Sequence, residues 1–397
     1  MGQSFTSGDC GYLLCYLVIK MNHKIQKINL QNLDEIKISI SPCNPFENLE
    51  YFQAMEMSDS ASEKTGWIPN HLGEIENGKL NSFLPLYKKF NSYGEFIFDQ
   101  QWANALQQTG RNYYPKFLTA IPFTPCEGER ILAPNDEKKI QLIDSCIELL
   151  KEDEIESWHI LFPNSAGKKI LRDQNFIERF NYRFVWRNNG FKDFDEFLAI
   201  FTSRQRATIR KERKSIKDAE IQFKNKSFDV ISKDDWDIFY NFYRQTYFER
   251  GQNPYLTKEF FYKINTANQI LKPVIFFAYY QNEVIAASLC FEGKDTLYGR
   301  HWGALKKVKN LHFECCYYQG IEYCIQNNVN YFDPGVQGEH KIRRGFQPKL
   351  DSSFHYFLKN DFADAVSNFC KSEKKQIENY IEACKSYTPF NKNYKIE

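Results

Sequence analysis

The residues best suited to chemistry lie together near the C-terminus. Residues 339–344 read Glu-His-Lys-Ile-Arg-Arg, between two nearby glycines on one side and a Gly-Phe pair on the other. Amide formation needs a base that takes a proton from an amine, and groups that stabilise the tetrahedral oxyanion. Glu339 is the candidate base and His340 the group that orients or polarises an acyl carbonyl, while Lys341 and Arg344 are candidates for binding an anionic ligand. The alternative is an exposed charged loop without chemistry.

A second concentration of charge lies in the middle of the chain. Residues 204–217 contain seven basic side chains and one acid, Glu212, although the whole chain carries only +2. On a helix, Arg206 and Arg210 are four residues apart and share a face. Because arginine forks match phosphate oxygens, this face predicts a site for phosphates or another polyanion. The alternative is the solvated face of an interdomain helix.

Three other residues are candidate ligand contacts. Arg300 lies in an aromatic, strand-like run, where it needs a partner, either a ligand or a carboxylate. Trp67 could stack on a sugar or base, or belong to the aromatic core. His159, beside a tryptophan in another strand-like run, is either a binding residue or a satisfied core histidine.

Composition and absent motifs exclude several classes of protein. The 397 residues carry 52 basic and 50 acidic side chains, which argues against a polycation built for duplex DNA. The 11 cysteines are scattered and contain no C-x-x-C pair, which favours a reducing, cytoplasmic location. His312, Cys315 and Cys316 could share a helix face, but without a second ligand pair we expect no metal site. The usual kinase, dehydrogenase, zinc-protease and serine-hydrolase motifs do not occur.

The C-terminal half has the clearest pattern of elements. Helical patterns at 236–249 and 258–271 precede three strand-like runs at 274–280, 284–291 and 296–302, whose short links predict antiparallel hairpins. A helix at 311–326 and a short strand at 330–333 follow.

A weaker version of this order occurs earlier in the chain. It consists of a hairpin over 67–75 and 80–87, a third strand at 95–98, a helix at 100–109 and a strand at 114–121. We therefore expect an α+β fold with two copies of one topology and mostly antiparallel sheets flanked by helices. The boundaries divide the chain into an N-terminal extension (1–24), a first domain (25–200), a basic interdomain helix (201–218) and a second domain (219–397). The apolar run at 12–19 is too short to cross a bilayer, so we expect no stable membrane insertion.

Several stretches resemble a known group of proteins. Residues 203–214, Ser-Arg-Gln-Arg-Ala-Thr-Ile-Arg-Lys-Glu-Arg-Lys, resemble the segment that links the two halves of Fem-type aminoacyltransferases. Residues 331–346, Tyr-Phe-Asp-Pro-Gly-Val-Gln-Gly-Glu-His-Lys-Ile-Arg-Arg-Gly-Phe, resemble the strand-then-loop segment of that group. Thr65–His71, Tyr298–Trp302 and Leu311–Gln319 look like a bacterial family described as peptidoglycan biosynthesis or recognition proteins, within the GNAT-like acyltransferase superfamily.

The resemblance implies tandem GNAT-like domains and an N-acyltransferase that moves an acyl or aminoacyl group to an amine, with a peptidoglycan precursor as a candidate acceptor. The donor would be an acyl-CoA or an aminoacyl-tRNA, with no permanently bound cofactor. Residues 303–311 lack the glycine spacing of acetyl-CoA-binding GNAT proteins, which argues against acetyl-CoA. Aminoacyl-tRNA is the donor that the Fem resemblance suggests, and its phosphates would suit the basic helix. The alternative is a non-catalytic module of the same fold that recognises a peptidoglycan-like or other anionic ligand.

Overall fold

The computed structural model describes residues 25–32, 37–38, 42, 44–336, 338–387, 389–392 and 394. The expected N-terminal extension, residues 1–24, lies outside the described residues and stays a prediction. In the part of the chain that is described, no helix is both long and apolar enough to cross a bilayer.

Three adjacent antiparallel strands form the centre of the second half, as the sequence predicts. They are β11 (Pro273–Tyr280), β12 (Glu283–Glu292) and β13 (Thr296–Ala304). Gln281 and Asn282 link the first two strands, and both have positive φ, at 50° and 66°. Such a two-residue turn matches the right-handed twist of the strands that it joins. The order of these three strands is therefore set locally.

The strand that follows is parallel to β13 and pairs with it over only three residues. β14 (Tyr331–Asp333) is reached through α11 (Leu311–Phe313), the π-helical turn η4 (Glu314–Tyr318) and α12 (Gln319–Gln326). Parallel strands require such a crossover, and a helix provides it. The pairing ends at Tyr298 and Asp333, whereas β13 continues to Ala304. The two strands thus separate beyond this point.

Within the described residues, eleven strands form one continuous, mostly antiparallel sheet. The other strands of this sheet, in spatial order after β14, are β9 (Ile177–Arg187), β15 (Gln347–Phe357), β8 (Ser157–Leu161), β7 (Lys116–Thr119), β6 (Tyr87–Lys89) and β3 (Trp67–Pro69), and β10 (Gln222–Ser227) borders β11. A second, four-stranded sheet has the order β1 (Ile25–Lys27), β4 (Leu72–Glu76), β5 (Lys79–Leu84) and β2 (Lys37–Ile38).

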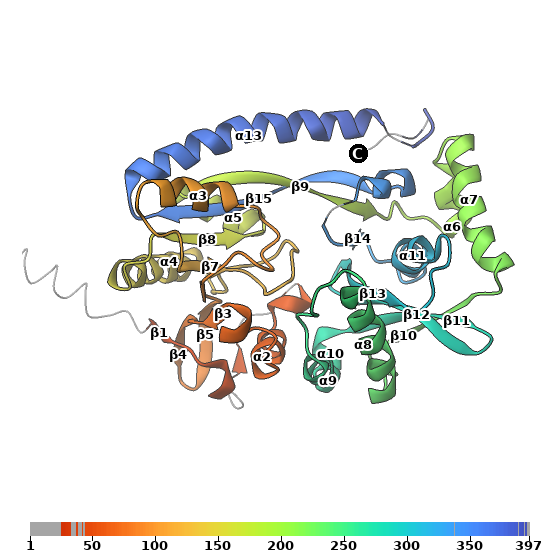
Figure 1. Cartoon of the computed structure of the whole chain (residues 1–397), viewed down its shortest axis with the longest axis horizontal. Helices are drawn as coiled ribbons and strands as arrows, with labels where there is room; N and C mark the ends of the chain where they lie inside the picture. Colours follow the sequence, from red (N-terminus) through yellow and green to blue (C-terminus); the bar gives the residue numbers. More distant parts are fainter. Residues whose placement is uncertain are drawn as a thin grey trace, which may run out of the picture.

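The helices flank both halves, and the longest of them follows the central strands. In Figure 1 this helix, α13, runs along β9 and β15, while α7 lies at one end of the molecule and α4 at the other. Besides α11 and α12, the helices of the described residues are α2 (Leu49–Met57), α3 (Gln100–Gln108), α4 (Asp136–Glu152), α5 (Ser165–Asp173), α6 (Phe194–Ala199), α7 (Ser203–Asp218), α8 (Lys233–Phe248), α9 (Lys258–Thr266), α10 (Asn268–Leu271) and α13 (Asn360–Ser386). Short 3-10 turns are η1 (Leu30–Asn32), η2 (Pro45–Glu47), η3 (Glu63–Thr65) and η5 (Glu339–Arg344). The mixed fold with helix-flanked, mostly antiparallel sheets confirms the predicted fold class.

Two local predictions for the first half are wrong. The segment expected as one strand over 67–75 is two strands, β3 and β4, which belong to different sheets and are separated at Asn70 and His71. The buried His71 side chain accepts from the backbone N–H of Leu86 at this corner. Residues 95–98, expected as a strand, form a loop because the ammonium of Lys116 draws Glu95 and Asp99 inward.

Candidate functional site

A hollow of about 1040 Å³ lies where β13 and β14 separate. We call it the central hollow. Its walls come from both halves of the chain: the loop before α3, the end of α8 and the loop after it, β13, η4 and the loop after β14. Three of the site residues predicted from the sequence line it, namely Arg300, His340 and Lys341.

A β-bulge places Arg300 in this wall. Leu289 pairs with His301 and Cys290 with Gly299, so Arg300 is the extra residue on β13. Bulges bend a strand and re-aim a side chain, often beside a functional site. Arg300 donates from Nη2 to the carbonyl of Phe123 at 2.8 Å. Its structural partner is therefore a carbonyl, rather than the carboxylate expected of an ion pair, and a ligand contact stays a prediction.

The π-helical turn η4 forms another part of the wall. Cys316 and Tyr317 from this turn line the central hollow. A π-helical turn breaks the regular backbone hydrogen bonding of the α-helix. At this turn the hydroxyl of Ser288 donates to the backbone carbonyl of Cys315 at 2.8 Å. Single π-turns inside helices are frequent at functional sites. Tyr317 was not among the candidates from the sequence, and its helical spacing marked it only as a core residue.

His340 contacts the Tyr317 hydroxyl through Nε2, at 2.8 Å. Burial lowers the pKa of His340 below its usual value, and the cations Arg344 and Lys341 lower it further. The imidazole is therefore neutral at pH 7 and able to accept a proton. Gly338 is required beside it, since φ is +103° and a Cβ at this position would lie 2.6 Å from Cε1 of His340.

Lys341 is the most deeply buried cation of this wall, with 2% of its surface exposed. Its ammonium donates to the carbonyl of Gly335 at 2.6 Å. Burial lowers the pKa of Lys341 to about 8, although Asp333 opposes this shift. The side chain thus carries a positive charge at pH 7 that is lost in mildly alkaline solution.

The two other candidates in η5 lie elsewhere. Glu339 is exposed and accepts a hydrogen bond from the Tyr380 hydroxyl of α13, at 2.7 Å, so its carboxylate points away from the central hollow. Arg344 is buried, donates to Glu212 of α7 at 2.7 Å and lies over the ring of Phe313. Neither position fits the role expected from the sequence. The reason is local: successive residues of a 3-10 turn point in different directions.

The basic helix does not share the central hollow with Lys341. Arg206 donates to the carbonyl of Phe201 at 3.2 Å, and Arg210 lies 3.3 Å from Asp195. Arg210 borders a separate groove of about 600 Å³. On α7, Glu212 lies roughly 200° around the axis from Arg210, and it is this acid that faces η5. The expected convergence of Arg206, Arg210, Lys341 and Arg344 on one cleft is therefore wrong.

Trp67 and His159 belong to the core. Trp67 packs against Tyr87 and Phe123, with the Lys89 ammonium 3.9 Å from its ring centroid. His159 on β8 is fully buried, with Nδ1 2.5 Å from the Nδ1 of His355. The core alternative that the sequence left open for each residue fits these surroundings.

The buried histidine pair predicts loss of stability in mild acid. Burial lowers the pKa of both His159 and His355 well below the usual value. The unfolded chain therefore binds protons near pH 6.5 that the folded chain rejects, and each such histidine costs about 1.4 kcal/mol per pH unit below that point. We expect the urea midpoint to fall steadily between pH 7 and 5.5, and less steeply in His159→Asn. A midpoint that stays level over this range would contradict the assignment.

Two further residues connect the walls of the central hollow, although the sequence did not single them out. Asp333 ends β14, and one of its oxygens accepts from the backbone N–H of Gly335 at 2.9 Å. Its other oxygen accepts from Arg183 of β9 at 2.7 Å. The position of Asp333, at a strand end and directly before Pro334, is a sequence pattern that could have marked it as a functional residue. Arg183 carried the same signal as Arg300, because it lies in an aromatic, strand-like run between Tyr182 and Trp186.

The fold and the hollow define a mixed α/β protein with a ligand-sized cavity at the divergence of two parallel strands. The chain belongs to the FemAB-like family, described as peptidoglycan biosynthesis/recognition, whose model matches residues 24–392. This confirms the resemblance read from the sequence.

Comparison with solved structures finds matches at low identity, with TM-scores below 0.5. FemX is 12% identical, covers 86% of this chain and 99% of its own, and has a TM-score of 0.48. L-PGS from Bacillus licheniformis is 8% identical over 77% of this chain and 92% of its own, with a TM-score of 0.45. A tandem GNAT protein from the clavulanic acid biosynthesis pathway is 7% identical over 81% and 98%, with a TM-score of 0.38. A search of curated protein sequences finds no match.

Proposed function

We propose that the chain is an N-acyltransferase that transfers an acyl or aminoacyl group from a CoA or tRNA donor to an amine, with a peptidoglycan precursor as the acceptor. The observation that carries this proposal is the pairing of a neutral imidazole, His340, with a neighbouring ammonium, Lys341, in one wall of the central hollow. A neutral base and a fixed cation are the two groups that amide formation requires.

The reaction assigns one proton transfer to His340. When Nε2–H donates to the Tyr317 hydroxyl, Nδ1 carries the free lone pair. The acceptor amine attacks the carbonyl carbon of the donor, and His340 takes the proton from the amine nitrogen. The carbon–sulfur bond of a thioester, or the carbon–oxygen bond of an aminoacyl ester, then breaks. The same proton passes to the departing thiol or hydroxyl, so that an amide and the free donor remain.

Lys341 would stabilise the charge that develops on the carbonyl oxygen. Its ammonium donates to the Gly335 carbonyl and, at 3.5 Å, to the Val336 carbonyl, which leaves one N–H donor for the oxyanion. In a site with little water, such a fixed cation stabilises the transition state more strongly than it would in solution. Arg300, with its guanidinium anchored on the Phe123 carbonyl, is the proposed contact for an anionic part of either substrate.

A binding module without catalysis is the second candidate. The family description itself includes recognition, and Glu339, the acid expected to act as base, points to Tyr380. In that case the central hollow would hold a peptidoglycan-like or other anionic ligand without bond formation. Incubation with donors and amines distinguishes the two, because only the enzyme changes the mass of the acceptor.

A tRNA donor would contact the exposed cations of α7. Arg210 and Lys214 both border the groove of about 600 Å³ and are exposed. If this face binds phosphates, Arg210→Ala and Lys214→Ala each weaken binding of tRNA and reduce the slope of log Kd against log salt by about one. Fluorescence anisotropy with labelled tRNA, over a series of salt concentrations, measures the slope.

Lys151→Ala is the matched control for this measurement. Lys151 is also exposed but lies on α4, at the opposite end of the molecule from α7 (Figure 1). An equal loss of slope in all three variants would mean that the protein attracts tRNA only through its general charge. Slopes that match the wild type in Arg210→Ala and Lys214→Ala would remove α7 from the proposal.

A further inference from the structure

A buried chain of polar contacts runs from the first half of the protein into the wall of the central hollow. Arg183 of β9 donates from Nε to Asp351 of β15 at 2.8 Å and from Nη1 to Asp333 of β14 at 2.7 Å. Asp333 in turn accepts from the N–H of Gly335, whose carbonyl accepts from the Lys341 ammonium at 2.6 Å. The four side chains that take part in these contacts are each at most 6% exposed.

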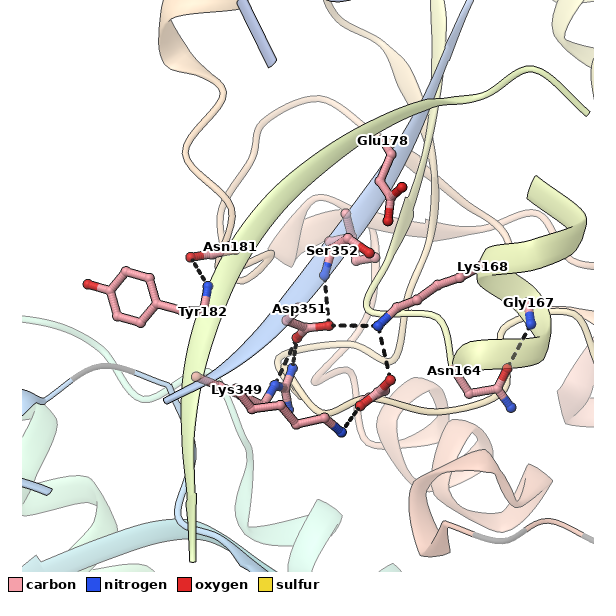
Figure 2. Close-up of polar contacts among 12 residues, drawn as sticks. Asn164, Gly167, Lys168, Glu178, Asn181, Tyr182, Lys349, Asp351 and Ser352 are labelled. Carbon is pink, nitrogen blue, oxygen red and sulfur yellow. Dashed lines mark hydrogen bonds and ion pairs between the residues drawn. The ribbon is translucent and has the colours of Figure 1, made fainter. Parts of the chain in front are cut away.

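The far end of this chain of contacts is anchored independently of the central hollow. Figure 2 shows the Lys168 ammonium and the backbone N–H of Ser352 joined to the Asp351 carboxylate. Lys168 of α5 lies 3.6 Å from Asp351. Asp351 therefore has partners besides Arg183, whereas Asp333 is neutralised chiefly by Arg183.

A buried carboxylate needs such a partner. At 6% exposure an unpaired charge is strongly unfavourable, so the Asp333 carboxylate would change its position without Arg183. This movement would release Gly335, since the Asp333 carboxylate fixes the N–H of this residue. Gly335 has φ +86°, a conformation that glycine adopts freely because it has no side chain.

We propose that Arg183 and Asp333 are positioning residues for Lys341: the pair fixes the Gly335 carbonyl that holds the ammonium, and the two opposite charges together set the protonation of that ammonium. The inference rests on the proposed function only for the use of Lys341 in transfer. The pair also explains why the two halves share one sheet, because β9 of the first half supplies Arg183 to a site in the second half.

The two charges act on Lys341 in opposite directions. Asp333 favours the charged form of the lysine and Arg183 disfavours it, so their effects offset each other in the wild type. Loss of Arg183 alone leaves the attraction of Asp333 unopposed, and loss of the Asp333 charge alone leaves the repulsion of Arg183. The charged and titratable groups that act on Lys341 from the elements packed around it are Asp333, Arg183, Cys316, His340 and His312, and Arg344 acts on the same two histidines.

Competitive labelling of Lys341 tests this proposal without any substrate. The full-length protein is labelled with trace acetic anhydride from pH 6 to 11, and the peptide that contains Lys341 is quantified by mass spectrometry. The pH of half-maximal labelling reports the ionisation of this lysine. We expect a wild-type midpoint near the pKa of about 8, an upward shift in Arg183→Met, and a downward shift in Asp333→Asn.

Controls separate the proposal from general damage to the fold. Arg172→Met removes a different ion pair, the one between Arg172 and Glu178, and should leave the labelling midpoint of Lys341 unchanged. Asp333→Asn keeps the shape of the side chain, so it provides a second test if Arg183→Met does not fold, as thermal unfolding would reveal. Midpoints that equal the wild type in both folded variants overturn the proposal, while the proposed transfer activity could still be measured separately.

Discussion

We expect His340→Gln to lower kcat by about 10²–10⁴-fold, with a much smaller change in substrate binding. The imidazole lines the central hollow, is neutral at pH 7 and is oriented by the Tyr317 hydroxyl. Glutamine keeps a polar side chain of similar length but cannot accept the amine proton. Initial rates of transfer, together with calorimetric titration of the acceptor into each variant, measure the two effects.

Glu339→Gln is the matched control, because it changes the adjacent residue of the same turn. The Glu339 carboxylate is directed to Tyr380 of α13, so turnover should stay within about threefold of the wild type. A large loss in Glu339→Gln with His340→Gln unaffected would reverse the assignment and restore the acid that the sequence favours.

Lys341→Met should lower kcat/KM by about 10²–10³-fold, the effect of losing one oxyanion donor. The pH dependence of the wild type follows from the same residue. The pKa of Lys341 is about 8, so the fraction with a charged ammonium falls as the pH rises through this value. His340 must be unprotonated to accept the amine proton. Because the pKa of His340 lies below 6.5, the usual value for histidine, activity falls in acid only at a pH below 6.5. We therefore expect a bell-shaped profile of kcat/KM.

Lys341→Arg separates charge from shape. A guanidinium stays protonated at every pH of the assay, so the alkaline fall in activity should disappear even if the absolute rate is reduced. An alkaline limb that persists unchanged in Lys341→Arg would mean that another group titrates near pH 8, and Lys341 would lose its role.

Local signals in the sequence were sufficient for much of the fold. The strands β11, β12 and β13 are rich in aliphatic and aromatic residues and are joined by links too short for any arrangement except adjacent antiparallel strands. The helix expected at 311–326 is present, with a π-helical turn inside it that its apolar spacing did not reveal. The strand expected at 95–98 failed because a distant residue, Lys116, determines this loop.

The site was predicted only in part, for reasons of side-chain direction. The motif from Glu339 to Arg344 does contribute to the central hollow, through His340 and Lys341. A sequence shows which residues are adjacent but does not show which of them a 3-10 turn directs inward, so Glu339 and Arg344 were assigned with their neighbours. The convergence of α7 with this loop failed for the same reason, because the face that meets η5 carries Glu212 rather than Arg210.

Mass analysis of candidate acceptors shows whether this protein transfers a group from a donor to an amine. Purified protein is incubated with a panel of acyl-CoAs and aminoacyl-tRNAs and with amine-bearing peptidoglycan precursors, and the acceptors are analysed by mass spectrometry. We expect at least one acceptor to gain the mass of the donor's acyl or aminoacyl group in the wild type and in Glu339→Gln, with the product reduced at least a hundredfold in His340→Gln. Binding of a precursor without a mass change from any donor would contradict transfer and favour a recognition module.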